Sequence, residues 1–218
     1  MMVHHHPSDE LLTAFAAGVL DLGQHIAVST HLVGCARCRA AVRAMEHIGG
    51  VVLDALPPSA MSPGSLEVLE ARLAAPASAP PKPQTTAHGE GLAGVPGLPA
   101  FMSRYPRSSW RWIAPRVHLR PIRLPEPSAT RVFLLKSSPG TKMVEHTHTG
   151  FEMTCVLSGS FVHAGGRFGP GDFDFGDGSV DHDVMIDSEE DCVCLVAMQG
   201  DLKLNGLIGR LLQPLIRL

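Results

Sequence analysis

The stretch GTKMVEHTHTGFEMTCVLSG, residues 140–159, decides the fold that we predict for this chain. It fills every fixed position of the pattern G-x5-H-x-H-x3-E-x6-G, with Gly140, His146, His148, Glu152 and Gly159. Side chains alternate between the two faces of a β-strand, so we expect His146 and His148 to point the same way. Glu152 then falls on the next strand, beyond a bend at residues 149–150. The pattern predicts a metal site between two strands.

The fourth ligand of this site is expected from a later hairpin. The stretch GPGDFDFGDGSVDH, residues 169–182, ends in His182, and His163 is the rival candidate. Three imidazoles and one carboxylate suit zinc, iron, manganese or nickel, and the ligand types do not choose among these metals. Four protein ligands around zinc would make the site structural, whereas catalysis needs an open position.

Short β-type runs surround this motif, from RVFLLK at 131–136 to CVCLVAM at 192–198, with Gly and Pro between them. Regularly spaced strands with turn residues predict a small β-sandwich or barrel, which we place at residues 98–200. Residues 201–218 have the pattern of a short amphipathic helix. On the last strand, Cys192 and Cys194 form either an oxidation-sensing thiol pair, if exposed and partly ionised, or a buried core pair.

The first 75 residues have a helical pattern instead. Ser8 followed by Asp9 and Glu10 predicts a helix start, because the Ser hydroxyl caps free N–H groups and acids suit the positive helix end. Apolar spacing and breakers predict helices near residues 9–19, 24–32, 35–56 and 65–75. Residues 76–97 are rich in Pro, Gly and Ala, which is linker composition.

A second group of metal donors lies in THLVGCARCR, residues 30–39, which contains His31, Cys35 and Cys38. Zinc prefers four N or S ligands in a tetrahedron, and a C-x-x-C turn brings two thiolates to one ion. The spacing leaves the fourth ligand open among five histidines: His4, His5, His6, His25 and His47. A redox dithiol and a pair of packed core thiols are the alternatives, although no βαβ pattern surrounds this C-x-x-C.

These motifs resemble two known families. The first segment, with H-x3-C-x2-C and with HHHPSDELLTAFAAGVL before it, resembles the zinc-binding anti-sigma domain of ChrR-type anti-sigma factors, a resemblance that makes His6 the fourth ligand. The second segment resembles the cupin fold, with a departure: the cupin motif G-x5-P-x-G-x2-H-x3-N keeps Gly171 and His182 but has Asp177, Ser179 and Ile186 at the other positions. The resemblance to ChrR-type proteins covers most of the chain.

The predicted fold class is therefore α + β multidomain: a small zinc-stapled helical domain at 1–75, a linker at 76–97, a cupin domain at 98–200 and a C-terminal helix at 201–218. The resemblance implies zinc held by His6, His31, Cys35 and Cys38, and a second divalent metal held by His146, His148, Glu152 and His182. It also implies an extracytoplasmic-function sigma factor as the partner, released in response to singlet oxygen and related peroxides. A cupin metalloenzyme, such as a thiol or diketone dioxygenase, is the alternative.

Composition limits the partners further. Residues 1–75 hold four Arg and Lys against seven Asp and Glu, which argues against DNA and suits a basic protein. The N-terminus lacks the pattern of a secretory signal, and no apolar run reaches the length of a membrane span, so we expect a cytoplasmic protein without membrane contact. We expect no enzymatic activity, and cupin barrels commonly pair into homodimers through their edges.

Overall fold

The computed structural model describes residues 2–75, 94–143, 146–177 and 184–204. Four helices come first: α1 (Asp9–Ala16), α2 (Leu22–Gly34), α3 (Ala36–Asp54) and α4 (Ser65–Ala74). The predicted cap is confirmed, because Ser8 Oγ accepts a hydrogen bond from the Leu11 N–H at 3.2 Å. Asp21 begins α2 with a capping box, exchanging two 3.0 Å hydrogen bonds with Gln24. None of the described helices is long and apolar enough to cross a membrane.

The rest of the described chain is antiparallel β-structure in three sheets, which follow a short 3-10 turn, η1 (Ala100–Arg104). The largest sheet has six strands in the order β1 (Arg111–Ala114), β2 (Val117–Ile122), β3 (Arg131–Ser137), β10 (Cys192–Gln199), β5 (Phe151–Ser158) and β8 (Phe173–Asp177). The second sheet has the order β7 (Gly166–Phe168), β6 (Phe161–His163) and β9 (Met185–Ile186). The third pairs β11 (Leu202–Leu204) with β4 (His146–His148). This confirms the expected combination of N-terminal helices and a cupin-like β-domain.

The expected C-terminal helix is wrong where the structure describes it. Residues Leu202–Leu204 form strand β11, because their backbone pairs antiparallel with β4, with Leu202 opposite His148 and Leu204 opposite His146. Backbone pairing with a neighbouring strand overrode the weak helical pattern. Residues 205–218 lie outside the described residues.

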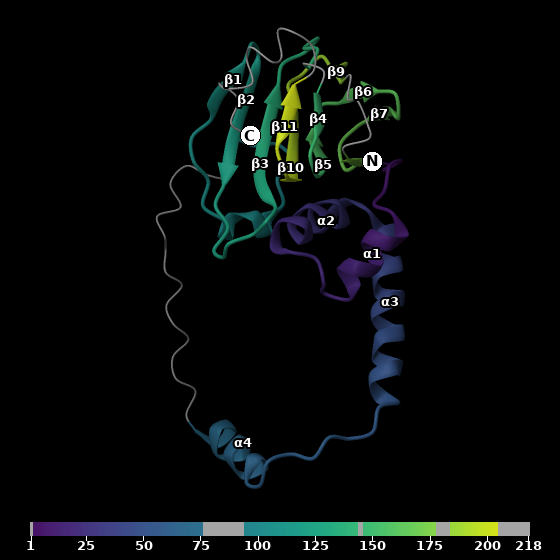
Figure 1. Ribbon diagram of the computed structural model, residues 1–218, viewed down its shortest axis with the longest axis vertical. Helices are drawn as coiled ribbons and strands as arrows, with labels where there is room; N and C mark the ends of the chain where they lie inside the picture. The colour runs from purple at the N-terminus through teal and green to yellow at the C-terminus, as the bar shows by residue number, and fades with distance from the viewer. Residues whose placement is uncertain (1, 76–93, 144–145, 178–183, 205–218) are drawn as a thin grey trace.

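The six-stranded sheet has two buried faces. On one face, Met153, Leu195 and Ala197 form a single core with Ile26 and Ala27 of α2. The other face carries a second apolar core that includes Phe133, Val196 and Met198. The two predicted domains therefore share a core: α2 packs on strands β5 and β10, and Figure 1 shows α1 and α2 gathered at one end of the β-domain.

Helix α2 approaches the sheet closely at its N-terminal end. Thr130 Oγ1 donates a 2.6 Å hydrogen bond to the capping carboxylate of Asp21. A Cβ on Gly23 would lie 2.8 Å from the side chain and from the carbonyl oxygen of Thr130, which is closer than packed atoms tolerate. Only a glycine at position 23 lets the helix dock at this distance.

We therefore expect Gly23→Ala to lower the free energy of unfolding by about 1 to 3 kcal/mol, the usual cost of overpacking a core. The matched control is Gly34→Ala in the same helix, where a Cβ would meet nothing within 4 Å. That change should leave stability equal or raise it by up to about 1 kcal/mol, because alanine favours the helix. Urea unfolding of the full chain followed by circular dichroism would measure both, and equal effects of the two changes would contradict the close contact.

Candidate metal centre

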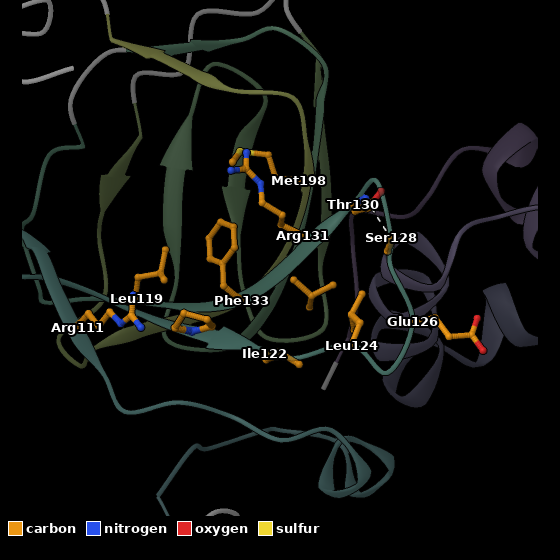
Figure 2. A pocket seen from close by; sticks show the side chains of 12 residues that line it. Arg111, Leu119, Ile122, Leu124, Glu126, Ser128, Thr130, Arg131, Phe133 and Met198 are labelled. Atoms are coloured by element: carbon orange, nitrogen blue, oxygen red, sulfur yellow. Dashed lines mark hydrogen bonds between the residues drawn. The ribbon is translucent and has the colours of Figure 1, made fainter. Parts of the chain in front are cut away.

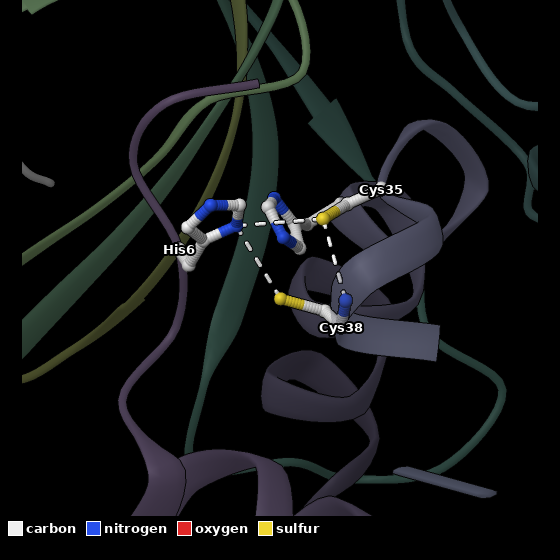
Figure 3. Close-up of side chains that lie close together, drawn as sticks. His6, Cys35 and Cys38 are labelled. Carbon is white, nitrogen blue, oxygen red and sulfur yellow. Dashed lines mark hydrogen bonds between the residues drawn. The ribbon is translucent and has the colours of Figure 1, made fainter. Parts of the chain in front are cut away.

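Four predicted zinc ligands meet at the junction of the helices and the sheet (Figure 3). His6 lies in the extended segment before α1, and His31 lies in the last turn of α2. Cys35 adopts an extended conformation between α2 and α3, and Cys38 lies in the first turn of α3. The Cys38 N–H lies 3.4 Å from Cys35 Sγ, so this thiol caps α3. The sharp break between two helices therefore brings both thiols and His31 to one point.

The distances within this group suit a tetrahedral ion. All four donor atoms lie within 4.8 Å of one another, and His6 Nδ1 lies 3.4 Å from Sγ of both Cys35 and Cys38. A zinc ion with bonds of about 2.0 Å to nitrogen and 2.3 Å to sulfur separates its ligands by about 3.5 Å. Two imidazoles and two thiols are also the donor types that zinc prefers in structural sites.

His31 gives the most direct sign of a metal-facing atom. Its side chain is fully buried, and its Nδ1 donates a 2.8 Å hydrogen bond to the carbonyl oxygen of Gly171. That bond places the proton on Nδ1, since a carbonyl oxygen only accepts, and it leaves Nε2 with a free lone pair. Nε2 is buried and has no hydrogen-bond partner among the described residues. A buried nitrogen without a partner is costly unless a ligand satisfies it.

Burial also sets the protonation of these groups. It lowers the pKa of His31 to about 4, so the imidazole is neutral at pH 7, as a metal ligand must be. Burial is also the main cause that lowers the pKa of His6, and nearby Arg37 adds to it. Burial, followed by the hydrogen bond and charge of Cys35, raises the pKa of the Cys38 thiol to about 12. A buried thiol of this kind is a poor redox nucleophile, whereas a divalent cation would stabilise its thiolate.

The other candidate histidines are used elsewhere. The His5 ring stacks on Phe168 with centroids 4.0 Å apart, and its Nε2 lies 3.1 Å from the Arg167 carbonyl oxygen. His25 stacks on Phe15 at 4.4 Å, and the cluster contains neither His4 nor His47. Tertiary structure therefore selects His6 among the five histidines that spacing left open.

The second predicted metal group is only partly described. His146 and His148 lie on β4, for which the structure describes the backbone alone, and His182 lies outside the described residues. Glu152 lies on β5, where its Oε1 accepts a 3.0 Å hydrogen bond from Thr154 Oγ1. The rival candidate His163 has its Nε2 3.1 Å from Asp174 Oδ2. The ligand set of this site therefore stays a prediction.

The motif glycine Gly159 has a clear structural role. Its φ is +69°, and a Cβ there would lie 2.8 Å from the carbonyl oxygen of Asp191 and 2.7 Å from the Cα of Cys192. The turn after β5 therefore needs glycine for two independent reasons, a left-handed backbone and a close approach to the start of β10.

Cys192 and Cys194 are buried, with their sulfur atoms 3.7 Å apart. The hydrogen bond with Cys192 and burial raise the pKa of the Cys194 thiol. Neither thiol is exposed, so the condition for an oxidation-sensing pair is not met, and both side chains belong to the apolar core. Cys155 faces the other side of the sheet, in the core shared with α2.

A pocket of about 400 Å³ opens on the β-domain (Figure 2). Its apolar lining includes Leu119, Phe133 and Met198, and Arg111 and Arg131 add positive charge. Arg131 is also 4.0 Å from the carboxylate of Asp201. The lining contains no residue of either predicted metal group, so we do not connect this pocket with the metal chemistry.

Comparison with known proteins places both halves of the chain. A family model described as the ChrR cupin-like domain matches residues 100–200, and a model described as a zinc-finger matches residues 8–39. The anti-sigma-E factor ChrR of Cereibacter sphaeroides is 33% identical over 218 residues, which is 100% of both chains. The chain belongs to the ChrR family.

The structure agrees with this ChrR assignment. In a crystal structure of Rhodobacter sphaeroides SigE in complex with the anti-sigma ChrR, one chain has 32% sequence identity and a TM-score of 0.73, with 91% of this chain and 100% of that chain covered. The zinc-finger match begins at residue 8, so His6 lies just outside it. The sequence did not predict Gly171 as a hydrogen-bond partner of His31. The only sequence signal at residue 171 was its place in the cupin motif.

We expect His6→Ala to weaken zinc retention by at least about 100-fold, because it removes a ligand. The loss of only a hydrogen-bond partner of a ligand already costs up to about 100-fold. His25→Ala is the matched control and should retain zinc like the wild type. Competition of the purified full chain with a chromogenic zinc chelator would measure both, and Cys35→Ser/Cys38→Ser would define the signal of this site. Loss of zinc in the His25 variant, with retention in the His6 variant, would contradict the assignment.

Proposed function

We propose that this chain is an anti-sigma factor that binds and inhibits an extracytoplasmic-function sigma factor. The observation that carries the proposal is an uncovered apolar surface on α3 and α4 in a chain of the ChrR family. Figure 1 shows α3 extending away from the β-domain and α4 lying apart from it. The solved relative binds SigE, which supports a partner of the same class for this chain.

The surface, which we call the apolar helix surface, consists of nine large apolar side chains that are 48 to 77% exposed: Ile48, Val51, Val52, Leu53, Leu56, Leu66, Val68, Leu69 and Leu73. Ile48, Val51 and Val52 on α3 recur at three- and four-residue spacing, and so do Leu66, Leu69 and Leu73 on α4. This is the pattern of a helix face that packs against a partner. Exposed apolar groups gathered in this way mark interaction sites, because water disfavours them. The acidic charge balance of residues 1–75 suits a basic partner surface.

Zinc would stabilise the helical part of this interface. We propose that His6, His31, Cys35 and Cys38 hold one zinc ion, which supplies folding free energy to a helical unit that is otherwise small. Because His31 lies on α2 and Cys38 on α3, these ligands would hold the angle between the two helices when zinc is bound. The orientation of the apolar helix surface then depends on bound metal. Such a protein works in the cytoplasm, where sigma factors meet RNA polymerase, and has no catalytic role.

The cupin-like domain is proposed to sense the chemical stress that releases the sigma factor. His146, His148, Glu152 and His182 are the proposed ligands of its divalent metal, and the resemblance to ChrR-type proteins supports a response to singlet oxygen and related peroxides. Loss or modification of this metal would weaken the binding of the helices to the partner. The zinc-dependent helices and the apolar helix surface distinguish this role from that of a stand-alone cupin enzyme, which needs neither.

The test of the partner is co-purification of the full chain with the extracytoplasmic-function sigma factors encoded in its source genome. Val52→Asp and Leu69→Asp should each weaken binding by at least about 30-fold, because a charge buried in an apolar interface costs roughly 2 kcal/mol or more. Trp112→Asp is the matched control, since this side chain is 66% exposed on β1. Unchanged binding by both helix variants would contradict the surface. Failure of the wild type to bind any sigma factor would favour a cupin enzyme, tested by iron-dependent oxygen uptake.

A separate prediction concerns the sensor. His146→Ala/His148→Ala should bind the sigma factor within about 2-fold of the wild type, because the apolar helix surface is untouched. The same variant should blunt the induction of a sigma-dependent reporter by a photosensitiser that generates singlet oxygen. His163→Ala, which changes the rival ligand, should leave the response intact. A normal response in the double variant would reduce the cupin metal site to a structural role.

A further inference from the structure

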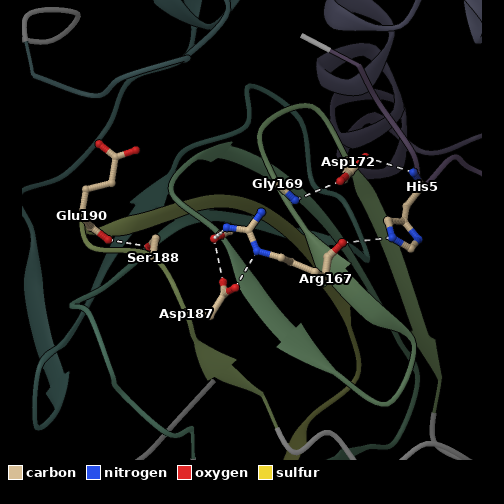
Figure 4. A network of polar contacts seen from close by, with 8 residues as sticks. His5, Arg167, Gly169, Asp172, Asp187, Ser188 and Glu190 are labelled. Atoms are coloured by element: carbon tan, nitrogen blue, oxygen red, sulfur yellow. Dashed lines mark hydrogen bonds and ion pairs between the residues drawn. The ribbon is translucent and has the colours of Figure 1, made fainter.

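The turn between β7 and β8, residues 169–172, belongs to the β-domain but contacts the N-terminal metal cluster through His31. Figure 4 shows Asp172 of this turn beside His5. The Gly171 carbonyl oxygen accepts the 2.8 Å hydrogen bond from His31 Nδ1. The Asp172 carboxylate accepts hydrogen bonds from His4 and His5, which belong to residues 4–6, a segment that we call the N-terminal strap. The strap carries His6, so one turn of the β-domain contacts the supports of both histidines in the cluster.

Asp172 holds the strap through backbone hydrogen bonds. Its Oδ1 accepts from the N–H groups of His4 at 2.6 Å and His5 at 3.0 Å, and its Oδ2 accepts from the Gly169 N–H at 2.9 Å. The residue is only 3% exposed, so its charge is stabilised mainly by these donors. Displacing the strap would leave a buried carboxylate without two of its partners, which is strongly unfavourable.

His5 fastens the strap at a second place. The Phe173 N–H donates to the His5 carbonyl oxygen at 3.1 Å, which extends the backbone contact to the start of β8. The His5 ring stacks on Phe168, and its Nε2 lies 3.1 Å from the Arg167 carbonyl oxygen. The next residue is His6, the one member of the cluster that comes from outside α2, α3 and the break between them. The β-domain therefore holds the segment that carries His6.

Gly171 supports the second histidine through its backbone. Its φ is +88°, in the left-handed region that glycine adopts without strain. This conformation presents the carbonyl oxygen to His31, and the hydrogen bond keeps the proton on Nδ1 and the lone pair of Nε2 toward the thiols. Partners of this kind fix the tautomer and the ring orientation of metal-binding histidines.

We propose that the β7–β8 turn is a built part of the N-terminal metal site, with Gly171 and Asp172 as positioning residues for His31 and His6. The inference rests on the proposed zinc site and adds that the β-domain sets how firmly that site holds its metal. Neither residue touches the ion; each acts through a histidine. Zinc retention therefore depends on contact between the two parts of the chain.

Strand β8 extends this dependence toward the proposed sensor. The strand begins beside the turn at Phe173, and near its other end Gly176 pairs in register with Glu152 of β5. Glu152 is a proposed ligand of the cupin metal. One short strand therefore connects the turn that supports the zinc ligands with the proposed second metal site. A displacement of β8 at one end would also move its other end.

The test is the rate at which the full chain loses cobalt(II) to an excess of chelator. Cobalt(II) replaces zinc in tetrahedral sites, and thiolate ligands give it an intense near-ultraviolet band that the His and Glu ligands of the cupin site cannot produce. Asp172→Ala should release the ion about 10- to 100-fold faster, the usual effect of losing an outer partner of a ligand. Asp172→Asn keeps an acceptor oxygen for the strap and should restore part of the loss. His5→Ala should also release the ion faster, without removing the buried carboxylate.

Thr130→Val is the matched control. It removes the 2.6 Å hydrogen bond to Asp21, which joins the helices to the sheet at the other end of α2, and it leaves the turn intact. Its release rate should stay within about 3-fold of the wild type. An equal acceleration by Thr130→Val and Asp172→Ala would overturn the inference, since general docking would then be the cause. Wild-type release rates in Asp172→Ala and His5→Ala would overturn it as well.

A second measurement needs no change in the turn. The His146→Ala/His148→Ala variant lacks two proposed cupin ligands, so chelation in it reports on the N-terminal site. Removing the metal should speed amide hydrogen exchange in residues 4–6 and 169–173 by at least about 10-fold, because the coupling between metal and turn is reciprocal. Exchange in residues 185–187 should stay unchanged. Unaltered exchange in the turn after metal loss would refute the inference. Absence of the thiolate–cobalt band from the wild type would instead refute the zinc site itself, so the two failures are distinguishable.

Discussion

The buried imidazole of His31 ties the helical part of the chain to the β-domain. One ring nitrogen donates to the Gly171 carbonyl oxygen, and the other belongs to a cluster with His6 and two thiols. Burial keeps the ring neutral, so both nitrogens have fixed and different roles. Without a partner for Nε2, the interior would contain an unsatisfied polar atom at the point where α2, α3 and the sheet meet.

The two faces of the six-stranded sheet border different groups of residues. One face forms a common core with α2 and ends beside the zinc cluster. The opposite face holds the buried thiols Cys192 and Cys194, and Glu152 of β5 pairs in register with Met198 of β10, which belongs to the same core. The two proposed metal sites would lie on opposite faces of this sheet, with no shared ligand. That arrangement suits a protein in which one domain senses a change and the other binds a partner.

The helices bury their apolar side chains near the β-domain and expose them farther away. The first turns of α3 bury Cys38 and Val42, whereas its second half and α4 expose large apolar side chains. A core cannot be completed there by the described residues, and a partner protein would bury this surface. The chain thus combines a buried base at the proposed zinc site with an exposed apolar surface that suits a partner.

The sequence by itself determined the local features. Ser8 as a cap, the helix break at Cys35, the alternating strands and the H-x-H-x3-E spacing follow from short-range geometry, and each was predicted from neighbouring residues. Spacing also found His31, Cys35 and Cys38, but it could not choose His6 over the other candidate histidines. The resemblance to ChrR-type proteins selected His6, and the structure places it beside the other three. The strand at Leu202–Leu204 and the contact of Gly171 and Asp172 with the cluster were decided only by tertiary structure. The physical reason is sequence separation: the Asp172 contact joins residues 168 positions apart, and no local pattern encodes a hydrogen bond that forms only after a helix has docked on a sheet.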